Sequence, residues 1–369
     1  MTVYLDYNAT SPLSPAARAA TLDAQDAAWG NPGSAHGVGQ QARHRLDQAK
    51  TAVARQLGCA AGELVVTSGG SEANATAIQA ALAGGGRAAC PAIEHSSVLR
   101  NAERPGRPVQ LLPVDTEGRL LPFTIDAGIS LLCVQFANNE LGTLHDVAAH
   151  AAAARKANPA VWVHCDAAQG PGKVPLQIRA LGVDSLTIAG HKFGAPKGIG
   201  LLWLRPGRTL QPLISGGRQQ QDRRSGTEDA ALVCALAAAL EERLANLDSE
   251  APRQRRALDA CFARIQAALP QARWLAQAAP RTPNVLNLAH PGVASDALQT
   301  RLDLAGYAVS RGAACMAIRG DASHVIAALG LPRDLALSAI RISIGPGTSE
   351  TEMLGFADAY VAAVRAMVG

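Results

Sequence analysis

The sequence is poor in charged residues, in aromatic residues and in long apolar runs. Of its 369 residues, 17% are charged and 4% are aromatic, whereas 48% are hydrophobic. Such a composition offsets chain entropy by burial, which predicts a globular protein and excludes a disordered one. The longest apolar run, at 230–240, has 11 residues, against roughly 20 needed to span a bilayer. Because MTVYLDYNAT carries charge where a signal peptide is apolar, we expect a soluble, cytoplasmic protein without membrane partners.

Paired cysteines and clustered basic residues are also lacking. The seven cysteines form no CxxC pair, and their odd number argues against both a disulfide framework and a zinc site. Reduced thiols and no metal are the expectation. The net charge of +4 is mild. Since phosphate binding needs a concentrated basic face, no direct nucleic-acid partner is expected.

Lysine is scarce, since 29 of the 34 basic residues are arginine and only five are lysine, at positions 50, 156, 173, 192 and 197. A guanidinium cannot form an imine with a carbonyl group, whereas a desolvated amine can. Each remaining lysine is therefore a candidate for amine chemistry. Three of the five lie between residues 173 and 197.

Apolar strand patterns alternate with alanine-rich helical patterns from about residue 60 onward. The predicted strands are 63–69, 109–114, 129–137, 161–167, 185–190 and 200–205. This alternation predicts an α/β protein with a mostly parallel sheet covered on both faces. After residue 228 the pattern changes to long helices followed by a smaller α/β unit. We predict a large domain over 15–250 and a small domain formed by 1–14 and 251–369.

Three loops that follow predicted strands carry chemistry. TSGGSEAN at 67–74 can bind an anion at a helix N-terminus, although a tight turn with an N-cap serine is the favoured interpretation when the motif is taken alone. Asp166 of HCDAAQGPGK lies at the end of a predicted strand, and Lys192 of IAGHKFGAPKGIG follows another. A buried ion pair is one interpretation of these two residues. The other is a carboxylate that holds a pyridinium and an amine that forms an imine, as in pyridoxal phosphate enzymes.

Eleven motifs in order along the chain are similar to those of one family. They are LDYNAT, GNPGSAHG, TSGGSEAN, EH at 94–95, ANNELGT, DAAQGPGKVP, GHKFGAPKGIG, RSGTED, SRGAAC, ASHVIAALG and IRISIG. Together they resemble the cysteine desulfurases, which are class V members of the fold-type I pyridoxal phosphate enzymes. The resemblance implies a large domain with a mostly parallel seven-stranded sheet and a smaller C-terminal α/β domain. The nine positions from Cys315 to His324 are similar to the long-loop, NifS/IscS-like type.

The resemblance implies a role for each candidate residue. Lys192 would hold pyridoxal 5'-phosphate and shuttle protons, Asp166 would keep the pyridine nitrogen protonated, and His95 would stack on the ring and act as acid or base. Arg341 would clamp the substrate carboxylate. The other cofactor contacts would be Gly70, Ser71 and His191 at the phosphate, Gln169 at the phenolic oxygen, Asn139 near that oxygen and the substrate, and Thr227 at the phosphate of the neighbouring subunit of a homodimer.

The implied reaction converts L-cysteine to L-alanine, with the sulfur captured as a persulfide on Cys315. An acceptor protein, whose identity the sequence does not reveal, would use that sulfur for iron–sulfur cluster or other thio-cofactor biosynthesis. Arg311 could lower the pKa of the Cys315 thiol. Two alternatives remain open: a selenocysteine lyase or other β-eliminase of class V, and a poorly active relative that serves as a binding subunit.

Several positions depart from the family pattern. Ala189 replaces a hydroxyl residue that contacts the phosphate, Arg218 replaces a third glycine, and Pro346 stands where many relatives have arginine. Arg311, Ala313 and Met316 alter the usual surroundings of the reactive cysteine. These changes remove no catalytic group, but several of them alter the rim where a sulfur acceptor would dock.

Overall fold

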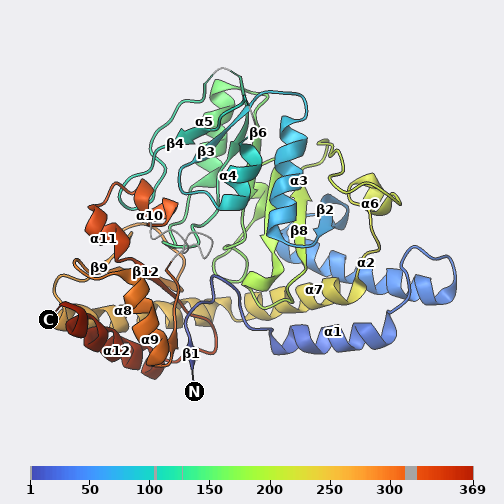
Figure 1. The fold of residues 1–369 in the computed structure, drawn as a ribbon. Coiled ribbons are helices and arrows are strands. Elements are labelled where there is room, and N and C mark those ends of the chain that lie inside the picture. Colours follow the sequence, from blue (N-terminus) through green and yellow to red (C-terminus); the bar gives the residue numbers. More distant parts are fainter. Residues whose placement is uncertain (1, 104–105, 127, 312–321, 369) are drawn as a thin grey trace.

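The computed structural model describes residues 2–103, 106–126, 128–311 and 322–368 (Figure 1). Its largest element is a seven-stranded sheet with the strand order β2-β8-β7-β6-β5-β3-β4. All pairs are parallel except those of β8, which runs antiparallel to β7 and β2. The strands are β2 (Leu64–Thr67), β3 (Arg87–Pro91), β4 (Gln110–Leu112), β5 (Ile129–Cys133), β6 (Trp162–Asp166), β7 (Ser185–Ala189) and β8 (Gly200–Leu204).

Helices cover both faces of this sheet. Successive side chains of a strand point to opposite faces, and the apolar side chains on both faces have to be buried. In β5, Leu131 and Cys133 pack with α3 (Gly70–Leu82) and α4 (Ser96–Ala102). Leu132 points the other way, into the core formed with α2 (Gly37–Leu57), α5 (Val147–Ala157) and α7 (Ala230–Ala245). A strand buried on both faces reads as a continuous apolar run, which is why the sequence predicted most of these strands. The expected α/β fold with a mostly parallel sheet is confirmed.

The helix ends follow from local sequence. Ser14 caps α1 (Pro15–Ala27) by accepting a hydrogen bond from the Ala17 amide, and a proline opens that helix. Asp229 caps α7 in the same way, and α2 ends at Gly58 in the left-handed conformation. The remaining helices of the described residues are α6 (Gln219–Asp222), α8 (Leu247–Ala268), α9 (Ser295–Leu304), α10 (His324–Ala328), α11 (Arg333–Leu337) and α12 (Glu350–Val368).

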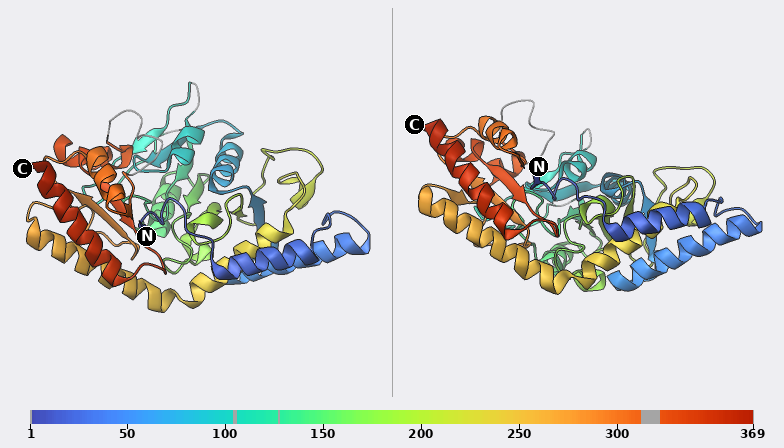
Figure 2. Two further views of the ribbon diagram at one scale, coloured as in Figure 1. Left: turned by 60° about the horizontal axis from the view of Figure 1, so that its bottom comes forward. Right: turned by 90° about the horizontal axis from the view of Figure 1, so that it is seen from below.

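A second core lies around a three-stranded antiparallel sheet with the order β12-β10-β9, formed by β9 (Arg273–Trp274), β10 (Val285–Ala289) and β12 (Ile340–Ser343). Figure 2 shows α7 and α8 nearly end to end along the base of the molecule, with α12 beside α8. The N-terminal strand β1 (Val3–Tyr4) pairs with β11 (Tyr307–Ala308), so the chain begins beside its C-terminal part. The domain limits at 15 and 250 stay a prediction.

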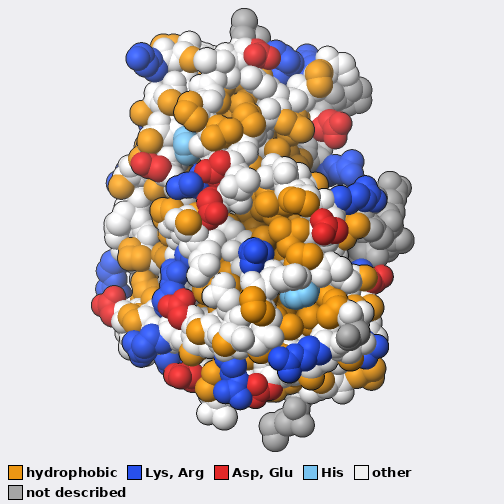
Figure 3. Space-filling model, turned by 90° about the vertical axis from the view of Figure 1, so that its left-hand side faces the viewer, with side chains coloured by type: hydrophobic (Ala, Val, Ile, Leu, Met, Phe, Trp, Pro, Cys, Tyr) orange, Lys and Arg blue, Asp and Glu red, His pale blue; other side chains and the backbone are white. Residues whose placement is uncertain are grey.

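The described residues contain no membrane-spanning helix, and the face drawn in Figure 3 carries charges of both signs. Within the described ranges, no helix combines the length and the apolar character that crossing a membrane requires. On the face drawn in Figure 3, basic and acidic side chains are intermingled around a hollow lined by hydrophobic ones. The six cysteines of the described part of the chain are free thiols, and that part contains no cluster of side chains suited to a metal ion.

Candidate active site

A cavity of about 350 Å³ lies beyond the carboxyl ends of the parallel strands, between the large sheet and β12. Its position and size are typical of a ligand site in an α/β protein. Its lining includes nine of the residues predicted from the sequence: Gly70, Ser71, His95, Asn139, Asp166, Gln169, His191, Lys192 and Arg341. Residues from distant parts of the chain therefore meet at one place.

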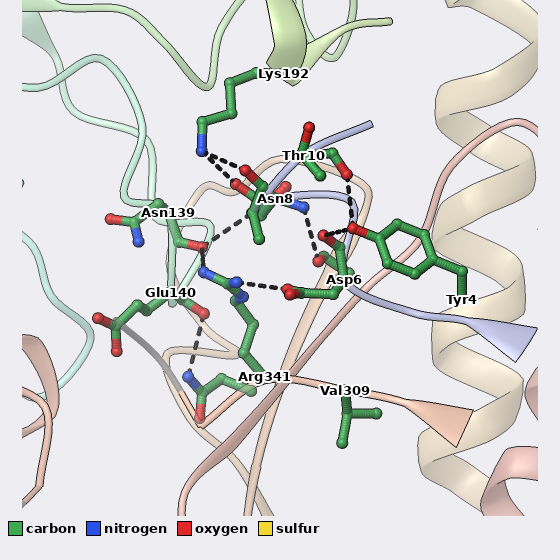
Figure 4. A network of polar contacts seen from close by, with 12 residues as sticks. Tyr4, Asp6, Asn8, Thr10, Asn139, Glu140, Lys192, Val309 and Arg341 are labelled. Carbon is green, nitrogen blue, oxygen red and sulfur yellow. Dashed lines mark hydrogen bonds and ion pairs between the residues drawn. The ribbon is translucent and has the colours of Figure 1, made fainter. Parts of the chain in front are cut away.

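Lys192 follows β7 through a short 3-10 turn, Gly190–Lys192, and reaches into the cavity. Its Nζ donates to the backbone oxygens of Asn8, at 2.8 Å, and Ala9, at 2.9 Å (Figure 4). Burial and, to a smaller extent, the positive charge of Arg341 lower the pKa of Lys192 to about 8, against opposing effects of Asp166 and Asp6. An amine with this pKa has a usable neutral fraction near pH 7, as bond formation with a carbonyl group requires.

Asp166 ends β6 at the floor of the cavity and is 8% exposed. Its two oxygens accept hydrogen bonds from neutral groups, the Asn74 side chain at 2.8 Å and the Ala168 amide at 2.9 Å. No cation among the described residues forms an ion pair with it. The buried Asp166–Lys192 ion pair, one of the two interpretations from sequence, is therefore not formed.

His95 is the residue before α4 and caps that helix with its own ring. Its Nδ1 accepts a hydrogen bond from the Ser97 amide at 3.1 Å and lies 2.7 Å from the Ser97 hydroxyl. Removal from water lowers the pKa of His95, although the negative charge of Asp166 opposes this change. The ring is therefore neutral around pH 7 and borders the cavity.

The start of α3 forms a cradle for an anion. Gly70 and Ser71 open this 13-residue helix, whose free amides and dipole favour negative charge. A Cβ on Gly70 would lie only 3.2 Å from the Cβ of Ala189, so glycine keeps this wall open. His191 stands nearby with Nδ1 3.1 Å from the Thr10 hydroxyl, and burial lowers its pKa to about 4. The cradle, the Asp166 carboxylate and the Lys192 amine suit the phosphate, the ring nitrogen and the aldehyde of pyridoxal phosphate.

Arg341 of β12 forms the opposite wall and is 3% exposed. Its Nη2 forms a 2.6 Å ion pair with Asp6, and its Nη1 donates to the Asn139 backbone oxygen at 3.1 Å. Its Nε lacks a hydrogen-bond partner in the described part of the chain. Figure 4 shows Arg341, Asp6 and Asn139 converging with Asn8 below Lys192. A guanidinium so placed can bind a carboxylate, but two of its three nitrogens, Nη1 and Nη2, already have partners.

The structure also reveals polar residues that sequence reasoning missed. Asn8 accepts from the buried Lys173 amine at 2.7 Å through its side chain and from Gln169 at 3.1 Å through its backbone oxygen. Lys173 also donates to the side-chain oxygen of Gln169. Because the Gln169 oxygen accepts from Lys173, the Gln169 amide nitrogen is free to donate to Asn8. The motif GPGK contained Lys173, but nothing local in the sequence indicated its partner.

Two further predicted residues are Thr227 and Cys315. Thr227 is exposed on the surface outside the cavity of its own chain. Cys315, with its neighbours Ala313 and Met316, lies outside the described residues. On one side of that segment, Ser310 lines the cavity. On the other side, Ser323 donates to Glu140 at 2.7 Å, and Glu140 is the neighbour in sequence of the cavity residue Asn139.

The departures from the family pattern have partial explanations. Arg218 adopts φ 60°, a left-handed conformation that glycine takes at lower cost, so this substitution adds backbone strain. Ala189 lines the cavity and contributes no hydroxyl there. The backbone oxygen of Pro346 accepts from Arg253 at 3.3 Å, which explains the position of the residue but not the choice of proline.

Comparisons with known proteins identify the family of this chain. The Aminotransferase class-V family model matches residues 3–355. A cysteine desulfurase of Cereibacter sphaeroides is 39% identical over 95% of this chain and 92% of its own length, and the cysteine desulfurase NifS of Azotobacter vinelandii is 34% identical over 95% and 90%. The chain therefore belongs to aminotransferase class V and, within it, to the cysteine desulfurases.

Solved structures give the same result. A NifS-like protein superimposes with a TM-score of 0.90 at 29% identity, covering 99% of this chain and all of the other. A structure of SspA in complex with cysteine has a TM-score of 0.80 at 28% identity and covers 94% of this chain and 99% of the other. The resemblance drawn from the eleven motifs is confirmed.

Proposed function

We propose that this protein is a pyridoxal phosphate-dependent cysteine desulfurase that converts L-cysteine to L-alanine and holds the sulfur as a persulfide on Cys315. The observation that carries the proposal is the convergence of Lys192, Asp166 and Arg341 on one cavity. Pyridoxal phosphate, when bound, supplies an electron sink for the substrate. Asp166 would hold its ring nitrogen, and Gly70, Ser71 and His191 would hold its phosphate.

The protein's own groups bind and orient the substrate. Arg341 would receive the carboxylate of cysteine, which places the substrate amine toward Lys192 across the cavity. The neutral amine of Lys192 takes a proton from the α-carbon and returns one later, which its pKa of about 8 permits near neutral pH. Asn139 lies beside Arg341 and borders the same space.

The sulfur transfer balances without an external oxidant. The Cys315 thiolate forms a bond to the substrate sulfur while the Cβ–S bond of the substrate breaks, and Cβ takes a proton. One L-cysteine and one thiol thus become one L-alanine and one persulfide, and a second thiol, on an acceptor protein, would then remove the outer sulfur.

Five of the other cysteines are poor nucleophiles, which supports this assignment. Burial raises the pKa of Cys59 and Cys261 to about 12, and it also raises the pKa of Cys133, Cys165 and Cys234. Since the thiolate is the reactive form, these thiols are inert at neutral pH. A homodimer in which Thr227 reaches the neighbouring cavity, and a location in the cytoplasm, belong to the same proposal.

The test is incubation of the cofactor-loaded protein with L-cysteine, followed by mass spectrometry of its peptides. We expect a gain of about 32 mass units, one sulfur atom, on the Cys315 peptide. Cys315→Ala should lose desulfuration by at least about a hundredfold, because no other thiol replaces the nucleophile. Cys59→Ala is the matched control and should keep its rate. Unchanged sulfide release by Cys315→Ala would instead favour a β-eliminase that needs no thiol.

A further inference from the structure

Asn74 of α3 lies 1% exposed beside the cavity. Its side-chain amide contacts two branches of the site, which are Asp166 on one side and Ser97 with His95 on the other. Its Nδ2 donates to Asp166 Oδ2 at 2.8 Å and to the Ser97 hydroxyl oxygen at 2.9 Å. Its Oδ1 lies 3.0 Å from Nε2 of His164. One buried amide thus uses both of its donor hydrogens and its acceptor on three side chains.

The direction of these hydrogen bonds follows from donor and acceptor counting. An ionised Asp166 accepts only, so the Asn74 amide must turn its NH₂ group toward it. The Asn74 oxygen then faces His164, whose Nε2 must carry hydrogen. Nδ1 of His164 must accept from the Ser185 hydroxyl, 2.8 Å away.

The hydrogen bond between Trp162 and Ser185 agrees with this assignment of donors and acceptors. The Trp162 indole can only donate, and its Nε1 donates to the Ser185 oxygen at 2.8 Å. Ser185 therefore has its own hydrogen available for His164. Burial lowers the pKa of His164 to about 4, so its ring is neutral, as this pattern requires. Since the side chains of Asn74 and His164 are both buried, Asn74 cannot rotate without leaving polar groups unpaired.

The second hydrogen of the Asn74 amide, donated to Ser97, determines which ring nitrogen of His95 carries a hydrogen. Because Ser97 Oγ accepts from Asn74, its own hydrogen is directed to Nδ1 of His95, 2.7 Å away. The Ser97 amide donates to the same nitrogen at 3.1 Å. With two donors on Nδ1, a neutral His95 carries its hydrogen on Nε2, the nitrogen turned away from Ser97.

We infer that Asn74 is a positioning residue that both orients Asp166 and, through Ser97, holds His95 as the Nε2–H tautomer. This inference rests on the proposed function, which gives Asp166 and His95 their roles toward the cofactor and the substrate. His95 then offers a hydrogen-bond donor to the cavity. It cannot receive a proton at Nε2 in this state, so proton removal from the substrate is left to Lys192.

The test uses the cofactor-loaded protein with ¹⁵N-labelled histidine, because the nitrogen shift distinguishes protonated from bare ring nitrogens. The His95 signals are assigned by their loss in His95→Gln. We expect a bare Nδ1 and a protonated Nε2 in the unaltered protein. His95 protonated at Nδ1 would overturn the inference directly, without any measurement of turnover.

Two variants separate the branches. Asn74→Ala should weaken cofactor retention and lower kcat/KM, each by about tenfold or more, because a hydrogen bond to a charged group is lost. It should also give His95 mixed tautomer signals. Ser97→Ala cuts only the His95 branch, so its His95 signals should shift while cofactor retention stays within about twofold.

Asn101→Ala is the matched control, since the Asn101 side chain donates to the backbone oxygen of Ser97 at 2.8 Å and not to its hydroxyl. If Asn74→Ala and Ser97→Ala leave the His95 signals like those of this control, the inference is wrong. If Asn74→Ala does not fold, Ser97→Ala decides alone. Failure of the proposed function is distinct, because the unaltered protein would then show the expected tautomer but form no alanine from cysteine.

Discussion

The wall of the cavity that carries Asp166 and the wall that carries Arg341 hold their charged groups in different ways. Asp166 receives hydrogen bonds from Asn74 and from the backbone, both neutral donors. Arg341 receives its main contact from the carboxylate of Asp6, at 2.6 Å. Neutral donors leave the negative charge of Asp166 uncompensated, whereas Asp6 largely compensates the positive charge of Arg341.

This difference corresponds to two kinds of ligand group. An uncompensated buried carboxylate is costly unless a cation meets it, and a protonated pyridine nitrogen is such a cation. A substrate that arrives and leaves in every cycle needs a site that is also stable when empty. The Asp6–Arg341 pair provides that stability, because a guanidinium buried without a counter-charge would be destabilising.

The two walls also differ in where their residues come from. Asp166, Asn74 and Ser97 all belong to elements of the large sheet or the helices packed on it. Arg341 belongs to the small sheet, and Asp6 lies in the N-terminal segment that connects the two parts. A shift of one part against the other would therefore alter the second wall and leave the first intact.

The largest expected effect comes from neutralising the first wall. Asp166→Asn should lower kcat by at least about a hundredfold, because an amide cannot compensate a protonated ring nitrogen. The measurement is alanine formation from cysteine, with the cofactor content determined separately. Asp126→Asn, at an exposed ion pair with Arg87, is the control and should keep full activity. Near-normal kcat in Asp166→Asn would show that the carboxylate does not face the ring nitrogen.

Removing the charge of the second wall should act mainly on KM. Arg341→Gln should raise the KM for cysteine by about thirtyfold, since a charge-assisted contact to the substrate carboxylate is lost. A fall in kcat with unchanged KM would contradict this role. The comparison of the two walls would then fail, because both would act on the chemical step.

The same variant has a second, independent result in the pH dependence. Arg341 is one of the groups that lower the pKa of Lys192 to about 8, so its removal should raise that pKa. Below the pKa, each pH unit leaves about tenfold less neutral amine. The rate of cofactor loading onto the cofactor-free protein should therefore rise with pH up to about 8 in the unaltered protein, and up to a higher pH in Arg341→Gln. Stopped-flow absorbance measures this rate.

Most of the fold and part of the site could be predicted from the sequence. Strands buried on both faces are continuous apolar runs. Asp166 ends one of them, and Lys192 follows another after a short turn. Strand β3 was not predicted, because RAACP combines charge, alanine and proline and has no strand pattern. Its place in the sheet comes from its pairing with β5 and β4.

The missed site residues have a common reason. Asn74 occupies the middle of a helical pattern, where an asparagine usually faces solvent, and only the packing of α3 on the sheet buries it. The partner of Arg341 is Asp6, 335 residues away in the chain. Contacts of this kind depend on tertiary packing, so no local spacing in the sequence could reveal them.

The smallest expected effect tests whether Asp6 competes with the substrate. Asp6→Asn keeps the shape of the side chain but removes its charge. Arg341 should stay in place, because it also donates to the Asn139 backbone and its strand pairs with β10. The substrate carboxylate would then meet an uncompensated guanidinium, and the KM for cysteine should fall by about fivefold, as expected for one partly exposed ion pair.

Steady-state kinetics at two salt concentrations measures this change. The KM advantage of Asp6→Asn should shrink at high salt, because screening weakens the attraction between the freed guanidinium and the substrate. A rise in KM would instead mean that Asp6 positions Arg341 for the substrate. The second wall would then resemble the first. Asp6 would be a fixed partner that orients Arg341, and it would not compete with the substrate carboxylate.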